Sequence, residues 1–266
     1  MAKKILMAKT PEEAIGAKTA ADAFVAGGTE VNRLGSDIAC SADTLISLKK
    51  CEGLKGISGD AGYVCIGAMT TFQDLAESDL TPCWLREAAL FMASRTKRNM
   101  ATIGGNIAAK RDDSYLIPAL SAAGAVLELM GKDGKTERTG IGDYTGGACA
   151  DMLITKVIVP KDIRLVSKRY SNTAQSHAVL TMSAAMSDEG ICLRGAVKNA
   201  GLLHFCDLEE KFRKEPDVSE DEIIKMVREC TGLETKDDMF GSDAYKRYLI
   251  AVTAFDLHRK LAGKEV

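Results

Sequence analysis

The chain has 266 residues, of which 46% are hydrophobic and 27% charged, and its formal net charge is −2. This balance is that of an ordinary globular protein, long enough to form two compact units. The near-neutral charge and the aromatic content of 5% argue against a surface for nucleic acid or for an anionic membrane.

The cysteines indicate a reduced environment. All eight are scattered along the chain without a Cys-x-x-Cys pair, which disfavours an iron–sulfur cluster or a structural zinc site. Unpaired thiols are typical of intracellular proteins, and neither a secretion signal nor an apolar segment of membrane-spanning length is apparent. We therefore expect a cytoplasmic protein with no membrane span and no bound metal.

The first part of the chain alternates short helices and strands. Thr10, Pro11 and Glu13 form the pattern of a helix start, with a capping residue, a proline at the first helical position and a capping-box glutamate. Thr70 or Thr71 is expected to cap a further helix. Helices are predicted over residues 11–20, 83–94 and 117–123, and strands over residues 23–26, 44–48, 63–68, 125–130 and 153–159.

The pattern changes after Pro160. Strands predicted at about 164–170, 178–186 and 190–197 fit an antiparallel meander, and the chain beyond residue 206 is expected to be helical, with a long helix over 244–261. We therefore predict a first domain over residues 1–160, with subdomains at about 1–55 and 56–160, and a C-terminal α+β domain over residues 161–266.

Two glycine pairs are the most informative motifs. Each ends an apolar run and is followed by a small polar residue. The first motif comprises Phe24, Val25, Ala26, Gly27, Gly28, Thr29, Glu30 and Val31, and the second comprises Thr102, Ile103, Gly104, Gly105 and Asn106.

Glycine adopts positive φ readily, and successive amides of such a turn form a concave nest that suits phosphate oxygens. Two such loops could hold a diphosphate from both sides, with hydroxyl and amide side chains as further donors. The alternative is that both pairs are only tight turns between a strand and a helix, since short motifs give false positives.

These motifs resemble those of the FAD-binding (medium) subunit of the molybdenum hydroxylases, the family of xanthine dehydrogenase and carbon monoxide dehydrogenase. The first motif of that family is similar to Ala26–Glu30, and the second to Ala101–Asn106. The Leu-x-Pro that follows is similar to Leu116-Ile117-Pro118, and the late strand that ends in proline to Leu153–Pro160. The resemblance covers nearly the whole chain, in the family's order.

The resemblance implies an α+β fold in which two small α/β subdomains (the vanillyl-alcohol-oxidase or PCMH type) hold the flavin, followed by a C-terminal domain of antiparallel sheet and helices. It implies FAD as cofactor, held by the two motifs, by Ile154 and by Lys168. It also implies an iron–sulfur subunit that delivers electrons, a molybdenum-cofactor subunit that oxidises the substrate, and NAD or another electron acceptor. No catalytic side chain is expected in this chain, because the flavin supplies the chemistry.

The chain departs from the family pattern at several positions. Tyr115 stands where the family often has an FAD-contacting aspartate, so either Tyr115 or the nearby Asp113 is expected to take that contact. Asn172 and Ser176 stand where the family frequently has an arginine and an aspartate, which leaves the electron acceptor open. The alternative function is a non-redox binding or assembly protein that retains the fold. A free-standing flavin oxidase is a third, less favoured hypothesis, because the sequence shows no group of side chains typical of a substrate-binding catalytic site.

Overall fold

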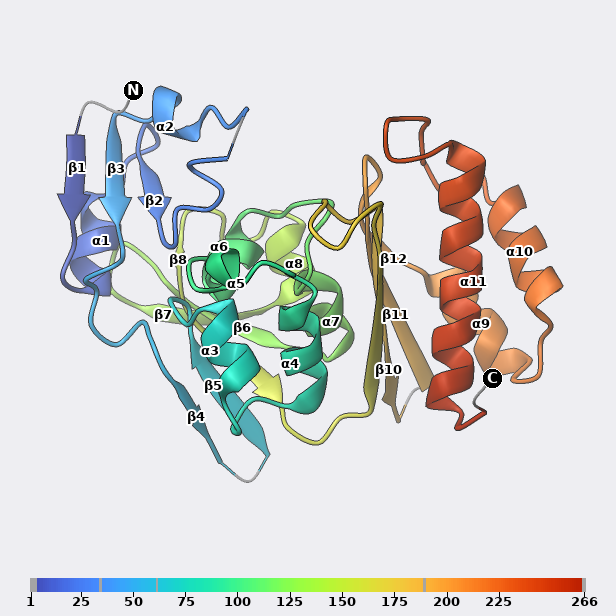
Figure 1. Cartoon of the computed structure of the whole chain (residues 1–266). Helices are drawn as coiled ribbons and strands as arrows, with labels where there is room; N and C mark the ends of the chain where they lie inside the picture. Colours follow the sequence, from blue (N-terminus) through green and yellow to red (C-terminus); the bar gives the residue numbers. More distant parts are fainter. Residues whose placement is uncertain (1–3, 34, 61, 189, 265–266) are drawn as a thin grey trace. The chain divides into compact units, whose positions relative to one another are not determined.

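The computed structural model of the chain (Figure 1) describes residues 4–33, 35–60, 62–188 and 190–264. Contacts divide the chain into two compact units, each built from three separate segments. Unit 1 consists of Met1–Pro82, Ser94–Ala109 and Gly124–Lys161, and unit 2 consists of Cys83–Ala93, Lys110–Ala123 and Asp162–Val266. The sequence predicts two consecutive domains that meet after residue 160, and this division stays a prediction.

A small parallel sheet opens unit 1. Strands β1 (Lys4–Met7), β3 (Thr44–Ser47) and β2 (Ala23–Val25) lie in that order. Helix α1 (Pro11–Ala17) begins as expected, since the Thr10 hydroxyl accepts from the Glu13 amide, but the Glu13 carboxylate accepts from the Lys9 amide at 2.7 Å. The helix ends three residues before the predicted end because Lys18 is extended. A second short helix is α2 (Ile38–Ser41).

An antiparallel sheet forms the rest of unit 1. Its order is β4 (Ile57–Gly59), β5 (Tyr63–Gly67), β8 (Leu153–Pro160), β6 (Val126–Met130) and β7 (Thr136–Gly140). The central strand β8 is largely buried, as its apolar sequence requires. The accompanying helices are α3 (Phe72–Glu77), α5 (Arg95–Arg98), α6 (Ile103–Ala108) and α8 (Ile141–Thr145). Of the two expected caps of α3, Thr71 is the one that forms a capping box, with Asp74.

Unit 2 is a sheet covered on both faces. The antiparallel strands lie in the order β12 (Gly201–His204), β11 (Gly190–Val197), β10 (Leu180–Ser187) and β9 (Leu165–Tyr170). Helices α4 (Cys83–Leu90) and α7 (Ile117–Ala122) lie on one face, and helices α9 (Cys206–Lys214), α10 (Glu220–Glu229) and α11 (Asp243–Leu261) on the other (Figure 1). The first six residues of β10 are consequently all buried, whereas a strand with one solvated face would alternate.

The observed elements confirm the predicted fold class. All predicted strands are present within two residues of their predicted ends, and the meander of β9, β10 and β11 is antiparallel. Four short strands were missed, namely β1, β4, β7 and β12. The polar strand β7, Thr-Glu-Arg-Thr-Gly, carries no hydrophobic alternation, and it forms because its backbone pairs with β6.

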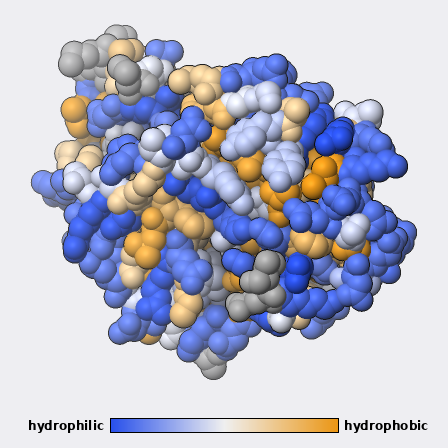
Figure 2. Space-filling model, turned by 45° about the vertical axis from the view of Figure 1, so that its right-hand side comes forward, coloured by the Kyte–Doolittle hydropathy of each residue, from blue (hydrophilic) through white to orange (hydrophobic). Residues whose placement is uncertain are grey.

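The face of the molecule drawn in Figure 2 is mostly polar. Figure 2 shows hydrophobic side chains in small separate groups among hydrophilic ones on the face that it presents. Within the described residues, no helix is both long enough and apolar enough to cross a bilayer.

The core of unit 2 yields a stability prediction. Ile250 on α11 is fully buried in the apolar cluster between the sheet and its helices. The variant Ile250→Ala should lower the free energy of unfolding by about 2–4 kcal/mol, because it removes buried methyl groups and leaves a cavity. Chemical denaturation followed by circular dichroism measures the change. Tyr248→Ala on the same helix, where the side chain is half exposed, is the control and should change stability by less than about 1 kcal/mol. Equal effects of the two substitutions would contradict this packing.

Candidate cofactor site

The first glycine motif is the loop that leaves β2. Gly28 has φ +75°, the left-handed conformation that glycine adopts without the cost of a side chain. Its carbonyl accepts hydrogen bonds from the backbone amide and the side-chain amide of Asn32, both at 3.0 Å. Gly27 is required for a different reason, because a Cβ there would lie 1.6 Å from the carbonyl oxygen of Met100. The positive φ expected from the sequence is therefore confirmed at Gly28 only.

This loop offers unpartnered backbone donors. Within the described residues, the amides of Gly27, Gly28 and Thr29 donate no hydrogen bond. Unpaired amides that are close in sequence suit the oxygens of an anionic ligand. Nearby, the Glu30 carboxylate pairs with the Arg33 guanidinium at 3.0 Å.

The second glycine motif is the first turn of helix α6. The expected nest at positive φ is wrong here, since Gly104 and Gly105 have helical rather than left-handed backbone. The Thr102 hydroxyl caps the helix by accepting from the Gly105 amide at 3.1 Å, which is the arrangement of an N-cap threonine. A Cβ on Gly104 would lie 2.7 Å from the Cβ of Ala68, so glycine is needed here for close packing.

Four of the five amides of the second motif donate hydrogen bonds within the protein. The Ile103 amide donates to the Thr70 carbonyl at 3.0 Å, and the Gly104 amide donates to the Ala68 carbonyl at 2.9 Å. These two donors hold the start of α6 against the segment that precedes α3, and the Gly105 amide donates to the Thr102 cap. The two motifs therefore differ: within the described residues, three successive amides of the first loop lack a partner, whereas in the second motif only the Thr102 amide does.

One cavity of unit 1 brings the two motifs together. Its volume is about 290 Å³, and residues of both motifs line it. A Cβ on Gly105 would lie 3.6 Å from the Cβ of Ala26, which shows how closely they approach. The predicted residues that line the cavity are Phe24, Ala26, Gly27, Gly28, Thr29, Glu30, Val31, Thr102, Gly104, Gly105 and Ile154.

Three predicted residues of unit 1, Val25, Ile103 and Asn106, do not line this cavity. Val25 is part of β2, and the Ile103 side chain is fully buried. The sequence carries no signal for the other lining residues, which belong to neither glycine motif: Lys18, Ile38, Leu48, Ala68, Met69, Ala108, Ala109, Tyr144 and residues 150–153. Burial raises the pKa of the Tyr144 phenol, so this hydroxyl is a neutral hydrogen-bonding group at physiological pH.

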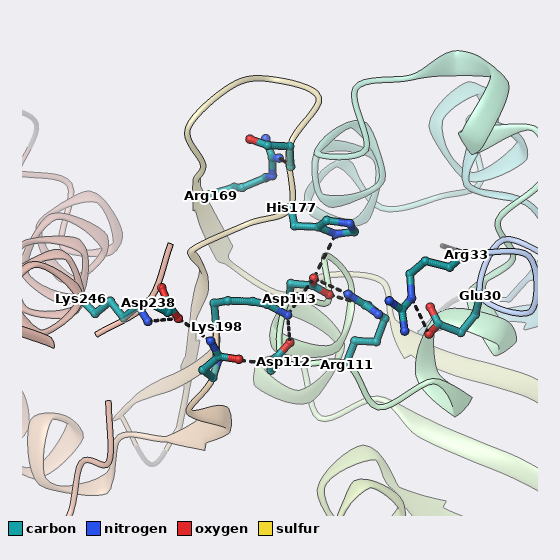
Figure 3. A network of polar contacts seen from close by, with 12 residues as sticks. Glu30, Arg33, Arg111, Asp112, Asp113, Arg169, His177, Lys198, Asp238 and Lys246 are labelled. Atoms are coloured by element: carbon teal, nitrogen blue, oxygen red, sulfur yellow. Dashed lines mark hydrogen bonds and ion pairs between the residues drawn. The ribbon is translucent and has the colours of Figure 1, made fainter. Parts of the chain in front are cut away.

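The remaining predicted residues, Asp113, Tyr115 and Lys168, belong to unit 2. Asp113 is the centre of a network of charges (Figure 3). The Arg111 guanidinium donates to both Asp113 oxygens at 2.6 Å, His177 Nδ1 lies 3.0 Å from Oδ2, and Lys198 Nζ lies 3.5 Å from it. Lys198 also donates to Asp112 at 2.7 Å.

This network fixes the charge of Asp113. Burial alone would raise its pKa, but the hydrogen bonds from His177 and Arg111 and the positive charges of Arg111 and Lys198 outweigh that effect. The pKa of Asp113 consequently lies well below its ordinary value of 3.8. Its carboxylate stays ionised and joins the loop after α6 to the residue that follows β11 and to the segment that precedes β10.

Tyr115 and Lys168 each have a partner that the sequence did not indicate. The Tyr115 ring lies 5.3 Å from the guanidinium carbon of Arg169, within the range of a cation–π interaction. Lys168 on β9 forms an ion pair with Asp256 on α11. Burial would lower the pKa of Lys168, but its hydrogen bond to Asp256 and its interactions with Tyr170 raise it, so this lysine stays a cation. Nothing in the local sequence pairs it with Asp256, which lies on another element.

Comparison with known proteins identifies the class. A model of the family described as the FAD binding domain in molybdopterin dehydrogenase matches residues 2–162. The chain belongs to this family of FAD-binding medium subunits of molybdopterin dehydrogenases.

Among its relatives, the uncharacterized protein YgfM of Escherichia coli (strain K12) is 34% identical over 91% of this chain and 89% of the relative. The nicotinate dehydrogenase FAD-subunit of Eubacterium barkeri is 27% identical over 76% of each chain.

Solved structures confirm the fold. A chain of carbon monoxide dehydrogenase from Hydrogenophaga pseudoflava superposes with a TM-score of 0.85 at 19% identity, over 100% of this chain and 99% of that chain. A chain of quinoline 2-oxidoreductase from Pseudomonas putida 86 gives a TM-score of 0.83 at 18% identity, with the same coverage. The PCMH-type fold with a C-terminal antiparallel sheet and helices is therefore confirmed.

The network around Asp113 predicts a pH-dependent contribution to stability. Because the folded pKa of Asp113 is depressed, its contribution is fully present above the unfolded pKa and is lost as the pH falls through the folded value. Asp113→Asn should lower the free energy of unfolding by about 3 kcal/mol at neutral pH, since the partly buried cations Arg111 and Lys198 lose their counter-charge. Below about pH 4, the free energies of unfolding of the variant and of the unsubstituted protein should become more similar.

Denaturant unfolding at a series of pH values measures this difference. Asp133→Asn is the control, because that carboxylate lies on the surface beside Lys135. A loss of stability in Asp113→Asn that is the same at every pH would contradict an ionised Asp113.

Proposed function

We propose that this chain is the FAD-binding electron-transfer subunit of a molybdenum hydroxylase complex. It would receive electrons from an iron–sulfur subunit and pass them through the flavin to NAD or another acceptor. The observation that carries the proposal is the cavity of unit 1, where two family motifs meet around unpartnered backbone amides. Membership of the FAD-binding family supports the choice of cofactor.

The residues of the cavity suit a dinucleotide. The amides of Gly27, Gly28 and Thr29 are donors for diphosphate oxygens, and neutral donors suffice for phosphate. The Thr29 and Thr102 hydroxyls are further donors, and Phe24, Val31 and Ile154 supply apolar contact. Bound FAD supplies the acceptance and release of electrons, while the chain supplies binding and orientation.

Other predicted contacts remain part of the proposal. Val25, Ile103 and Asn106 would act by shaping the two motifs, and Lys168 would place a cation near the flavin. Between Tyr115 and Asp113, the geometry favours Tyr115 as the contact to FAD. Both Asp113 oxygens already accept charged hydrogen bonds from Arg111, so Asp113 instead serves to hold the loop that carries Tyr115.

The names of the relatives support the proposed partners. One relative is named a FAD-subunit and another, from Afipia carboxidovorans, a medium chain of carbon monoxide dehydrogenase. Such names denote one chain of a larger enzyme, so we propose an iron–sulfur subunit and a molybdenum-cofactor subunit as partners here. The residues of this chain indicate the electron acceptor less directly than they indicate the cofactor. Asn172 and Ser176 stand in place of the family's charged pair, and Ser176 closes a turn with Thr173 by hydrogen bonds of 2.8–3.1 Å.

The visible spectrum of the purified protein tests the cofactor. We expect a yellow protein, or a colourless one that becomes yellow on incubation with FAD and stays yellow after removal of the unbound flavin, because the unpartnered amides can pair with its phosphates. A protein that neither contains FAD nor takes it up would instead support the alternative, a binding or assembly protein that retains the fold.

A substitution at Gly28 tests the first loop. Gly28→Ala should weaken FAD binding at least about tenfold, a loss of about 1.4 kcal/mol. A side chain at this φ is strained, and its Cβ would lie 3.0 Å from the Asn32 side-chain amide, so the loop that carries the donors must shift. Titration of the flavin-free protein with FAD, followed by absorbance, measures the affinity.

Gly53→Ala is the matched control. Gly53 has φ +76°, nearly that of Gly28, but a Cβ there meets nothing within 4 Å, and Gly53 does not line the cavity. The two substitutions therefore impose a similar backbone strain, and only Gly28→Ala should change the affinity for FAD. Equal affinities in the two variants would count against the assignment of this loop.

The proposed complex can be tested by purification from the native source. An affinity-tagged chain should bring down one chain with iron–sulfur clusters and one with molybdenum, which mass spectrometry and metal analysis would identify. Recovery of a yellow chain without either partner would contradict the electron-transfer role within such a complex, but it would leave FAD binding intact.

A further inference from the structure

The junction of β12 and α9 brings three metal-ligating side chains together. His204 is the last residue of β12, Cys206 is the first residue of α9, and Glu209 lies one turn further along the helix. One ligand atom of each, an imidazole nitrogen, the thiol sulfur and a carboxylate oxygen, lies within 4.8 Å of the others. This cluster lies in unit 2 and has no part in the cofactor site of unit 1.

The Glu209 carboxylate is held in place by its other oxygen. Oε1 accepts hydrogen bonds from the Leu193 amide at 2.6 Å and from Arg194 Nη1 at 2.7 Å. Oε2 faces the His204 ring, whose Nε2 lies 2.9 Å away. The strand register supports the arrangement, because Arg194 on β11 is paired with His204 on β12. Such outer hydrogen bonds orient a ligand in metal sites.

The donor set selects a particular class of ion. Thiolate sulfur, imidazole nitrogen and carboxylate oxygen are the three ligand types that zinc uses, with bonds of about 2.0–2.3 Å. Ligand atoms around a tetrahedral ion with such bonds are about 3.3–3.8 Å apart, so small side-chain rotations bring these three atoms into range. The thiolate and the carboxylate together carry two negative charges, which balance a divalent cation.

The cluster is open to small molecules. His204 and Cys206 also line a cavity of about 530 Å³, and both side chains are exposed. A three-ligand site with access to solvent leaves one position for water, as in zinc sites that exchange a ligand.

We propose that His204, Cys206 and Glu209 bind one thiophilic divalent cation of the zinc class. This metal site is distinct from the proposed FAD site, and the proposal does not depend on FAD binding. The competing explanation is that His204 and Glu209 form only an ion pair beside an unrelated thiol.

Metal titration of the full-length chain tests the proposal. Zn²⁺ affinity is measured by competition with a chromophoric chelator, and Cd²⁺ difference spectra report thiolate coordination in the ultraviolet. We expect one Zn²⁺ per chain and a cadmium–thiolate band. His204→Gln and Cys206→Ser should each weaken Zn²⁺ binding at least about tenfold, since even outer-shell changes cost 10–100-fold, and Cys206→Ser should abolish the band.

Cys230→Ser is the matched control, because Cys230 lines the same cavity but is not one of the three ligands. This variant should keep both the affinity and the band. Circular dichroism verifies that each variant is folded, and His204→Asn replaces His204→Gln if the latter is not. Absence of stoichiometric binding, or an unchanged band in Cys206→Ser, would overturn the proposal, whatever the flavin content of the protein.

Discussion

The close crossing of two backbone segments at Gly27 is the constraint on which the proposed cofactor site depends. The Met100 carbonyl occupies the space that a side chain at position 27 would need. Any other residue there would push the first loop away from the segment that leads into α6. The cavity between the two motifs exists because this contact is made by bare backbone, and close packing of this kind tolerates no added atoms.

The four motif glycines thus serve three different physical needs. Gly28 supplies a left-handed backbone conformation, Gly27 and Gly104 allow backbone to approach neighbouring atoms, and Gly105 leaves room beside the threonine that caps α6. Within the described residues, the amides of Gly27, Gly28 and Thr29 lack a partner, whereas those of Ile103, Gly104 and Gly105 are all hydrogen-bonded. The cavity therefore combines a loop with free backbone donors and a wall held by internal hydrogen bonds, rather than two equivalent loops.

Local patterns in the sequence were enough to predict eight of the twelve strands of the described residues, including the meander, and to single out both glycine motifs. Hydrophobic runs and capping residues carry that information over short distances. The second motif was misjudged because two glycines disfavour a helix, whereas the Thr102 cap and the bonds to Ala68 and Thr70 stabilise one. The distant partners Lys198 of Asp113 and Asp256 of Lys168 could not be predicted either. They lie 85 and 88 residues away along the chain, and only the folded structure brings them near.

The discontinuity of unit 2 affects how the protein is made. Helices α4 and α7 are synthesised early, yet the sheet that they cover is encoded after residue 161. During synthesis, the apolar faces of these helices stay exposed to water until most of the chain has left the ribosome. Chaperones could bind these exposed faces in that period. A fragment that begins at β9 would lack both helices. One face of β10 would then be exposed to water, and such a fragment would tend to aggregate.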